Sequence, residues 1–381
     1  LPFHITRPEK TYGDGEILKR EGNGVTQFIG DDFSFEIDHA TSRIRNYVYK
    51  GRKLIDEGPA PYFWRAETAN DINDGHDRKW RDAHVDMVTA RRDIKAGAGD
   101  AQWIVDVELR LPNAGNMTEN VTYEIFNDGA VRVTFAMGDK NRFGRLIKFG
   151  SVMTMPGEFE QLDWYGFSET EAFIDRKGFQ RLGRYQSTVS DMYYPYLFPQ
   201  DTGTLTDIKW MSFAPAAGGP ALLMVGEEPV QASALHFTAE QLQEAKHPYE
   251  LTPLDKTIVS IDQVSQGAGN ASCGPQLLPE YQLQNGEDYR YTFTLLPFTA
   301  GEDDPHAIGK PYMKAAPTAM PELPEPPEEP DPTEPEPTEP EPTEPEPTEP
   351  EPTEPEPTEP EPTEQDPTEP EHTEPEHTEQ H

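Results

Sequence analysis

Hydrophobic and polar residues alternate along most of the chain between residues 28 and 298. The pattern is clearest where Phe33, Phe35 and Ile37 alternate with polar neighbours, which predicts a half-buried strand. Asn127-Asp128-Gly129 separates two such runs and is a tight-hairpin signal. Because strands recur at short spacing with few helical intervals, the pattern favours an antiparallel sandwich over βαβ units. Further strands are expected at 44–49, 103–111, 117–126, 130–137, 146–155, 258–263 and 289–296.

Helical signals are few. Thr238 followed by Gln241 three residues later resembles a capping box and predicts a short helix over 238–246. A short helical turn is expected around Trp80. Asn285-Gly286 is expected to close a last hairpin between residues 278–283 and 289–296.

Composition divides the chain into three parts. Residues 1–27 are glycine-containing and poorly periodic, so they are expected to be the end of a preceding module and a linker. Residues 28–300 form the predicted sandwich. Residues 301–381 are expected to be a disordered spacer, because from residue 332 they repeat Pro-Thr-Glu-Pro-Glu without apolar side chains to bury. Such a tract favours extended polyproline II. The start at Leu1 suggests a piece of something longer.

Charge and cysteine content exclude several classes of function. Of the net charge of −38, −24 lies in residues 321–381, which leaves −14 for residues 1–320. Without a basic patch, binding to nucleic acid or an anionic membrane is not expected. The sequence contains no run of about 18 apolar residues, so it predicts no membrane-spanning helix. Cys273 is the only cysteine, so no intrachain disulfide can form.

Residues 164–203 carry the densest motif, with many aromatic residues, an Asp-Arg pair and two prolines. Pro195 and Pro199 predict an extended segment over 192–199. Its large rings are too many for a solvated loop, so we expect them in a core, an interface or a sugar-binding surface. Asp175 and Arg176 are expected to form a structural ion pair inside or beneath a loop.

This motif resembles the C-terminal β-sandwich of the β-galactosidases of glycoside hydrolase family two, which split enzymes carry as a small subunit. The family pattern is W-x-G-x-G-P-x-E-x-Y-x-D-R, then G-x-Y and D-M-Y-x-P-Y-x-x-P-Q-E-x-G. Ser168-Glu169, Phe173 and Asp201 depart from it. The matching positions include Trp164, Glu171, Asp175, Arg176, Tyr193, Pro195 and Tyr196.

Two further segments extend the resemblance over about residues 28 to 298. Trp64, Arg65, Asn70 and Asp71 match the family's W-R-A-P-x-D-N-D-I. The resemblance implies that the next residues form a mobile loop at the rim of the active site: Asn73, Asp74, Gly75 and His76. Residues 267–275 match G-x-G-x-x-S-C-G-P, and Cys273 lies where some members place a tryptophan that stacks on the sugar. A chain with cysteine there lacks that stacking surface.

The fold that the resemblance implies is an all-β antiparallel supersandwich of the galactose mutarotase type. The function it implies is retaining hydrolysis of terminal β-D-galactose in β-galactosides, such as lactose. That chemistry needs two carboxyl groups about 5 Å apart. In the family both are glutamates on a TIM barrel, which this sequence does not contain, so the chain alone is expected to be inactive. Its expected partners are that barrel, in the same enzyme or a large subunit, and a galactoside.

The resemblance also implies Mg²⁺ and Na⁺ for the whole enzyme, with ligands outside this chain, and an oligomer is expected. The family implies a cytoplasmic location, whereas an acidic proline-rich tail is typical of extracellular or cell-surface proteins. The cluster Asp71, Asp74, His76 and Asp77 has metal-ligand residue types, but its spacing matches no known ligand set.

Three alternatives remain open from the residues. Glu169, Glu171 and Asp175 could supply a catalytic pair of this chain's own. A non-catalytic carbohydrate-binding module would bind sugar without partners. An aldose-epimerase-like enzyme would need a histidine and a carboxylate converging on the concave face, with His236 or His247 as the histidine.

Overall fold

The computed structural model describes residues 12, 15–74, 78–137 and 142–313. The alternating patterns form strands that pair antiparallel throughout the described part of the chain. In β3 and β9 the buried residues are mainly at every second position, as a sheet with one face on the core requires. The first strands are β1 (Leu18–Gly22), β2 (Val25–Ile29), β3 (Phe33–Asp38), β4 (Ile44–Tyr49) and β5 (Arg52–Tyr62).

The middle of the chain adds two groups of strands and a short helix. The first group is β6 (Val88–Ala96), β7 (Trp103–Leu111), β8 (Met117–Ile125) and β9 (Val131–Met137). The second is β10 (Lys148–Pro156), β11 (Gln161–Gly166) and β12 (Gly183–Thr188), followed by helix α2 (Val189–Met192). The last strands are β13 (Leu205–Ala214), β14 (Gly219–Leu235), β15 (Lys256–Ser265) and β16 (Arg290–Ala300).

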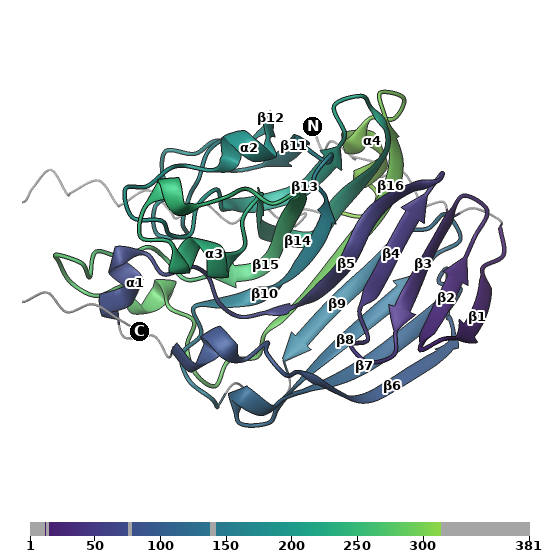
Figure 1. Cartoon of the computed structure of the whole chain (residues 1–381), viewed down its shortest axis with the longest axis horizontal. Helices are drawn as coiled ribbons and strands as arrows, with labels where there is room; N and C mark the ends of the chain where they lie inside the picture. The colour runs from purple at the N-terminus through teal and green to yellow at the C-terminus, as the bar shows by residue number, and fades with distance from the viewer. Residues whose placement is uncertain (1–11, 13–14, 75–77, 138–141, 314–381) are drawn as a thin grey trace, which may run out of the picture. The chain divides into compact units, whose positions relative to one another are not determined.

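All these strands join one curled sheet in the order β1-β2-β3-β4-β5-β10-β15-β14-β16-β9-β8-β7-β6, with β13 on β14 and β11 between β12 and β13. Its two arms, β1–β5 and β6–β9, lie one behind the other in Figure 1. Phe28 of β2 contacts Trp103 of β7, and Ser42 Oγ lies 3.0 Å from Thr89 Oγ1 of β6. The hydrophobic core fills the space between the arms, so the predicted antiparallel supersandwich is confirmed.

Short helices lie at the ends of the strands: α1 (Ala69–Asp74), α3 (Ala239–Glu244), α4 (Pro305–Gly309) and the 3₁₀ turns η1 (Arg78–Asp82), η2 (Pro112–Ala114), η3 (Pro248–Glu250) and η4 (Pro279–Tyr281). The predicted capping box of α3 is present, with Thr238 and Gln241 each bonding the other's backbone N–H. The helical turn at Trp80 is also confirmed as η1. None of the helices described is long and apolar enough to cross a membrane.

Three local predictions differ from the structure. Residues 18–29, partly assigned to a linker, form β1 and β2, which extend the sheet beyond Phe28. Residues 278–283 contain η4 and one isolated bridge, from Leu283 to Leu146, rather than a hairpin strand, because β16 finds its partners in β9 and β14 instead. Ordered structure continues past Gly301, since α4 places Ile308 against the buried cluster around Trp210. Residues 314–381, most of the predicted spacer, lie outside the described residues.

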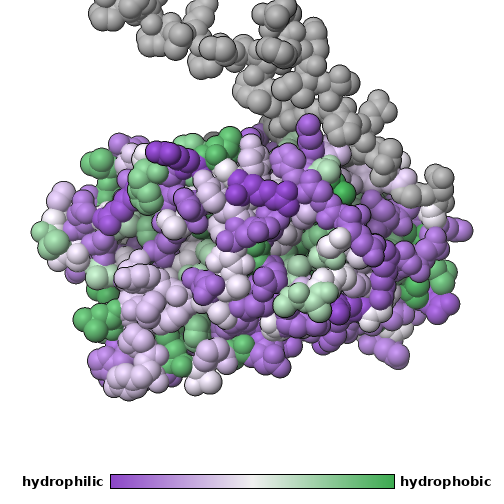
Figure 2. Space-filling model, turned by 90° about the horizontal axis from the view of Figure 1, so that it is seen from above, coloured by the Kyte–Doolittle hydropathy of each residue, from purple (hydrophilic) through white to green (hydrophobic). Residues whose placement is uncertain are grey.

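The surface seen in Figure 2 is mainly hydrophilic, with hydrophobic side chains in separate small groups. One exposed group belongs to the segment after α2: Tyr194, Leu197 and Phe198 are exposed, Leu197 to 89%. The rings of Tyr194 and Phe198 therefore lie outside the core, whereas the ring of Tyr193 packs on Phe237 with centroids 4.9 Å apart. Residues 193–199 contain no helix or strand, as the prolines predict.

Candidate functional site

The three family-like motifs meet at one edge of the sheet, around the buried side chain of Arg65. Its guanidinium donates from Nε to Asp71 Oδ2 at 3.2 Å and from Nη2 to Asp71 Oδ1 at 2.9 Å. It also donates to the carbonyl oxygens of Gln266 and Gly267, at 2.9 and 3.2 Å. Arg65 thus ties the start of α1 to the loop that follows β15.

Asp71 is held as a carboxylate at the centre of this network. Its oxygens also accept from Thr68 N and from Gln266 Nε2, at 2.9 and 3.1 Å. Burial acts to raise the pKa of Asp71, but the charge and hydrogen bonds of Arg65 outweigh it and lower the pKa. Charge-assisted bonds to a buried carboxylate resist rearrangement, so this part of the site is preorganised.

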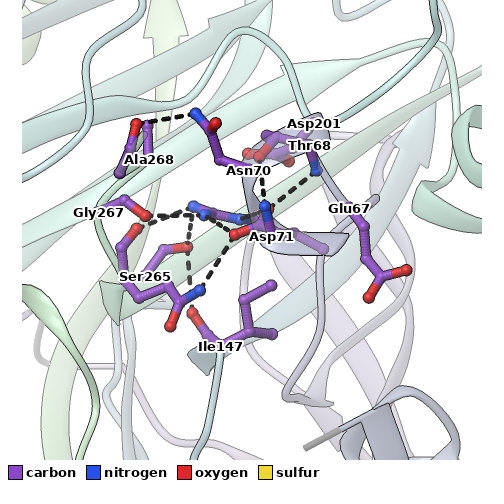
Figure 3. A network of polar contacts seen from close by, with 12 residues as sticks. Glu67, Thr68, Asn70, Asp71, Ile147, Asp201, Ser265, Gly267 and Ala268 are labelled. Atoms are coloured by element: carbon purple, nitrogen blue, oxygen red, sulfur yellow. Dashed lines mark hydrogen bonds and ion pairs between the residues drawn. The ribbon is translucent and has the colours of Figure 1, made fainter. Parts of the chain in front are cut away.

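Asn70 links the same two segments nearer the surface. Its Nδ2 donates to Gly269 O at 2.8 Å, and its Oδ1 accepts from Ser272 N at 3.0 Å. Figure 3 shows Asn70 and Asp71 facing Ser265, Gly267 and Ala268. Because both halves of the amide are used, Asn70 sets the distance between α1 and residues 269–272.

The Asp175-Arg176 pair supports the loop from the other side. Asp175 accepts from the N–H groups of Ala268 and Gly269 at 2.8 and 2.9 Å. Arg176 donates to Gly269 O and, at 2.8 Å, to Asn270 Oδ1. The two side chains lie 3.9 Å apart, so the predicted structural pair beneath a loop is confirmed.

The predicted rim residues occupy this edge. Asn73 is exposed at the end of α1, where its Nδ2 donates to Ala69 O at 3.3 Å. Asp74 also belongs to α1, so these two positions are helical rather than loop. Gly75 and His76 lie outside the described residues. Cys273 is an exposed free thiol in the turn after Asn270, whose carbonyl accepts from Cys273 N at 3.1 Å.

Glu171 and Asp175, two of the three residues proposed for an internal catalytic pair, instead hold backbone. Glu171 accepts from Tyr196 OH, and from Gly203 N at 2.7 Å, which fixes the segment that contains Pro195. Asp175 accepts from the backbone N–H groups of Ala268 and Gly269. Trp164 is buried in the core, where its indole N–H donates to Ser168 O at 2.8 Å.

The histidines of the epimerase alternative also have structural contacts. His236 Nε2 lies 2.7 Å from Glu160 Oε2, and His236 Nδ1 lies 2.8 Å from Lys256 O. The other oxygen of Glu160 accepts from Ser190 N at the start of α2. His247 stacks on Tyr249. Among the described residues no group of three or more His, Cys, Asp or Glu side chains could hold a metal ion, and Asp71 is paired with Arg65.

Comparison with protein families matches residues 29–295 to the model described as β-galactosidase small chain. The chain belongs to the β-galactosidase small-chain family. The match covers most of the sheet and all three segments that converge on Arg65.

Curated relatives of this small-chain domain include a β-galactosidase of Priestia megaterium, 30% identical over 78% of this chain and 29% of the relative. A β-galactosidase of Halalkalibacterium halodurans is 28% identical over 70% of this chain and 27% of the relative. The chain therefore spans less than a third of these relatives. Among solved structures, a galactose 1-epimerase from Lactobacillus acidophilus NCFM has 10% identity and a TM-score of 0.40 over 76% of this chain and 100% of that chain.

The family motifs indicated which residues belong together, but other members of the network carried no signal. Ser265 Oγ accepts from Arg65 Nη1 at 2.9 Å, and Gln266 bonds Asp71. These residues come from the end of a strand that the sequence presents as an ordinary alternating run. Only the folded sheet brings the end of β15 to Arg65 and Asp71.

Proposed function

We propose that this chain is the part of a β-galactosidase that completes an active site whose catalytic glutamates lie on a TIM barrel outside this sequence. The reaction is hydrolysis of terminal β-D-galactose residues with retention, by two displacements. Mg²⁺ and Na⁺ bind the barrel portion in this proposal. The observation that carries it is the convergence of three family motifs on Arg65, which locks two exposed segments, the end of α1 and residues 270–273, into one rim.

The role of this rim is to shape the entrance of the active site rather than to transfer protons. Asn73 offers an exposed amide and Cys273 an exposed thiol, which can contact a sugar at the entrance. A rim held by buried, charge-assisted bonds orients a sugar without having to be ordered on binding. The Asn70 amide sets the spacing of the two segments, so its loss should act on catalysis through geometry.

The test is hydrolysis of a chromogenic β-galactoside by the 381-residue chain alone and mixed with a barrel-bearing β-galactosidase fragment that lacks its own small-chain domain. Activity is expected only in the mixture. Asn70→Ala should reduce the activity of the mixture by about tenfold or more, since small misplacements near a reacting centre cost that much. Asn285→Ala, in an exposed turn, is the matched control.

Each contrary result has a distinct meaning. Hydrolysis by the chain alone would contradict the placement of both glutamates on the barrel. Full activity of the Asn70→Ala mixture, with normal folding by circular dichroism, would show that the rim does not shape the active site. Sugar binding by the chain with no activity in any mixture would favour the carbohydrate-binding module.

A further inference from the structure

A partly open cavity of about 130 Å³ lies against the sheet beside helix α3, in walls supplied by β5, β10, β14 and β15. The chain alone builds it. Aromatic and aliphatic side chains form part of the wall, including Tyr62, Trp64 and Phe237. The rest is polar, which is the usual composition of a site for a small molecule.

Lys148 provides a buried ammonium group in the wall of this cavity. Its Nζ lies 3.2 Å from Asp262 Oδ2 and donates to Ser260 Oγ. Ser260 Oγ in turn lies 2.9 Å from Asp262 Oδ1, so the three side chains form a closed group. Burying two opposite charges gains little stability compared with packed hydrophobic residues, which makes the pair weak as a stability device.

The backbone makes room for this group. Gly150 of β10 lies directly opposite Asp262 of β15, at a register shift between Phe149 and Gly150. A Cβ atom on Gly150 would come within 1.9 Å of Asp262 Oδ1, so only glycine fits beneath the carboxylate. Irregular pairing and a strand glycine commonly re-aim a side chain next to a functional site. Here they let Asp262 reach back to Lys148.

Further polar groups of the cavity wall can form hydrogen bonds with a ligand. The indole Nε1 of Trp64 is buried and has no hydrogen-bond partner among the described residues. Asp201 accepts from Thr204 Oγ1 at 3.2 Å, and burial raises its pKa to about 6 although Arg65 and Lys148 act against this. Glu240 accepts from Tyr62 OH at 2.6 Å. The cavity wall thus carries both donors and acceptors.

Size and charge limit what can bind. An engineered cavity of about 150 Å³ in another protein holds benzene, so this partly open cavity of about 130 Å³ can enclose a six-membered ring whose substituents extend through its opening. Lys148 is neutralised by Asp262 and Arg65 by Asp71, which leaves no unpaired cation for an anionic ligand. Arg65 and Lys148 lie in the wall beside Asp201 and Glu240, so groups of both signs face a ligand. A neutral ring with several hydroxyl groups can satisfy donors and acceptors together and place its C–H faces on aromatic rings.

We propose that this cavity binds one free neutral monosaccharide in its pyranose form. The site lies within this chain, and the inference does not rest on the proposed completion of a β-galactosidase active site. It differs from the rim at Asn73 and Cys273, which are not part of the cavity wall.

The experiment is isothermal titration of the 381-residue chain, without any barrel fragment, with D-galactose as the probe. Saturable binding with a dissociation constant of about 1 mM is expected for a small neutral ligand. Galacturonic acid and galactosamine, which add a negative and a positive charge, should bind at least about tenfold more weakly. Absence of saturable heat up to about 100 mM would overturn the proposal, and so would tighter binding of either charged sugar.

Two cavity-filling variants test the location. Val152→Phe and Ser233→Leu add volume from β10 and β14, and each should weaken galactose binding by about tenfold or more. Ser34→Leu, at a half-buried serine of β3 outside the cavity wall, should bind as the unaltered chain does. Circular dichroism and thermal unfolding identify any variant that has not folded. Unchanged binding by a folded filling variant would exclude this cavity as the site.

Discussion

Arg65 and Asp71 form a two-bonded ion pair in which both side chains are only 1% exposed, and this pair joins the first helix to the loop after β15. The relationship has an energetic consequence. Removing one partner of a buried pair leaves the other charge unpaired, which is far more costly than losing an ion pair at the surface.

Arg65→Met should therefore lower the free energy of unfolding by about 3–5 kcal/mol, measured by urea denaturation. The matched control is Arg45→Met, because Arg45 is 46% exposed and pairs with Asp38 at 3.0 Å. Its expected cost is about 1 kcal/mol or less. Equal costs for the two variants would show that the buried pair is not what holds this edge of the sheet together.

Whether the sequence predicts a contact around Arg65 depends on how far apart the two residues stand in the chain. The Asp175-Arg176 pair and the positions of Asn70 and Asp71 could be identified from motifs, because the residues stand close together in the chain. The partners Ser265 and Gln266 could not, since they are about 200 residues away from Arg65 and meet it only after the sheet has curled.

The same distinction applies to the strands. Periodicity predicted the bounds of β7 at 103–111 correctly, because that strand has one face on the core. It missed β1, whose residues are mostly exposed and whose place in the sheet depends on pairing with β2. Alternation also predicts a strand at 278–283, where the chain forms η4 and only Leu283 pairs, in an isolated bridge to Leu146.

Glu119 offers a test of pH dependence. Its carboxyl group is fully buried without a hydrogen-bond partner among the described residues, and burial raises its pKa well above the ordinary value. A pKa that is higher in the folded state means that stability is greatest below the unfolded value of about 4.3 and falls as pH rises. The unaltered chain should therefore lose stability between about pH 4.5 and neutrality through this group.

Glu119→Leu should remove this loss and stabilise the protein near neutral pH by at least about 1–3 kcal/mol, the cost of an unsatisfied buried polar group. The measurement is urea unfolding at several pH values. Glu280→Gln, at an exposed glutamate of η4, controls for the loss of a carboxylate elsewhere. Parallel pH profiles for the Glu119→Leu variant and the unaltered chain would contradict the assignment.

Gly150 should tolerate no side chain. Gly150→Ala would drive a methyl group into the Asp262 carboxylate, and overpacking a buried position costs about 1–3 kcal/mol. Gly22→Ala is the control, because nothing lies within 4 Å of a Cβ atom there. The melting temperature should fall for Gly150→Ala and stay nearly constant for Gly22→Ala. An unchanged melting temperature in both would mean that Asp262 can move aside without cost.

Cys273 allows a gain-of-contact test of the proposed active-site rim. The thiol is exposed in a turn held by Asn270, so a larger side chain can project from it without disturbing the core. Cys273→Trp adds a ring on which the leaving-group part of a galactoside can stack, and ring contacts contribute about 0.5–1.5 kcal/mol. In the mixture with the barrel-bearing fragment, KM for an aryl β-galactoside should fall about two- to tenfold with kcat nearly unchanged, because stacking on the leaving group binds substrate and transition state alike. Cys273→Ser removes the thiol without adding a ring and should leave KM unchanged, whereas a KM for Cys273→Trp equal to that of Cys273→Ser would place this turn outside the substrate's reach.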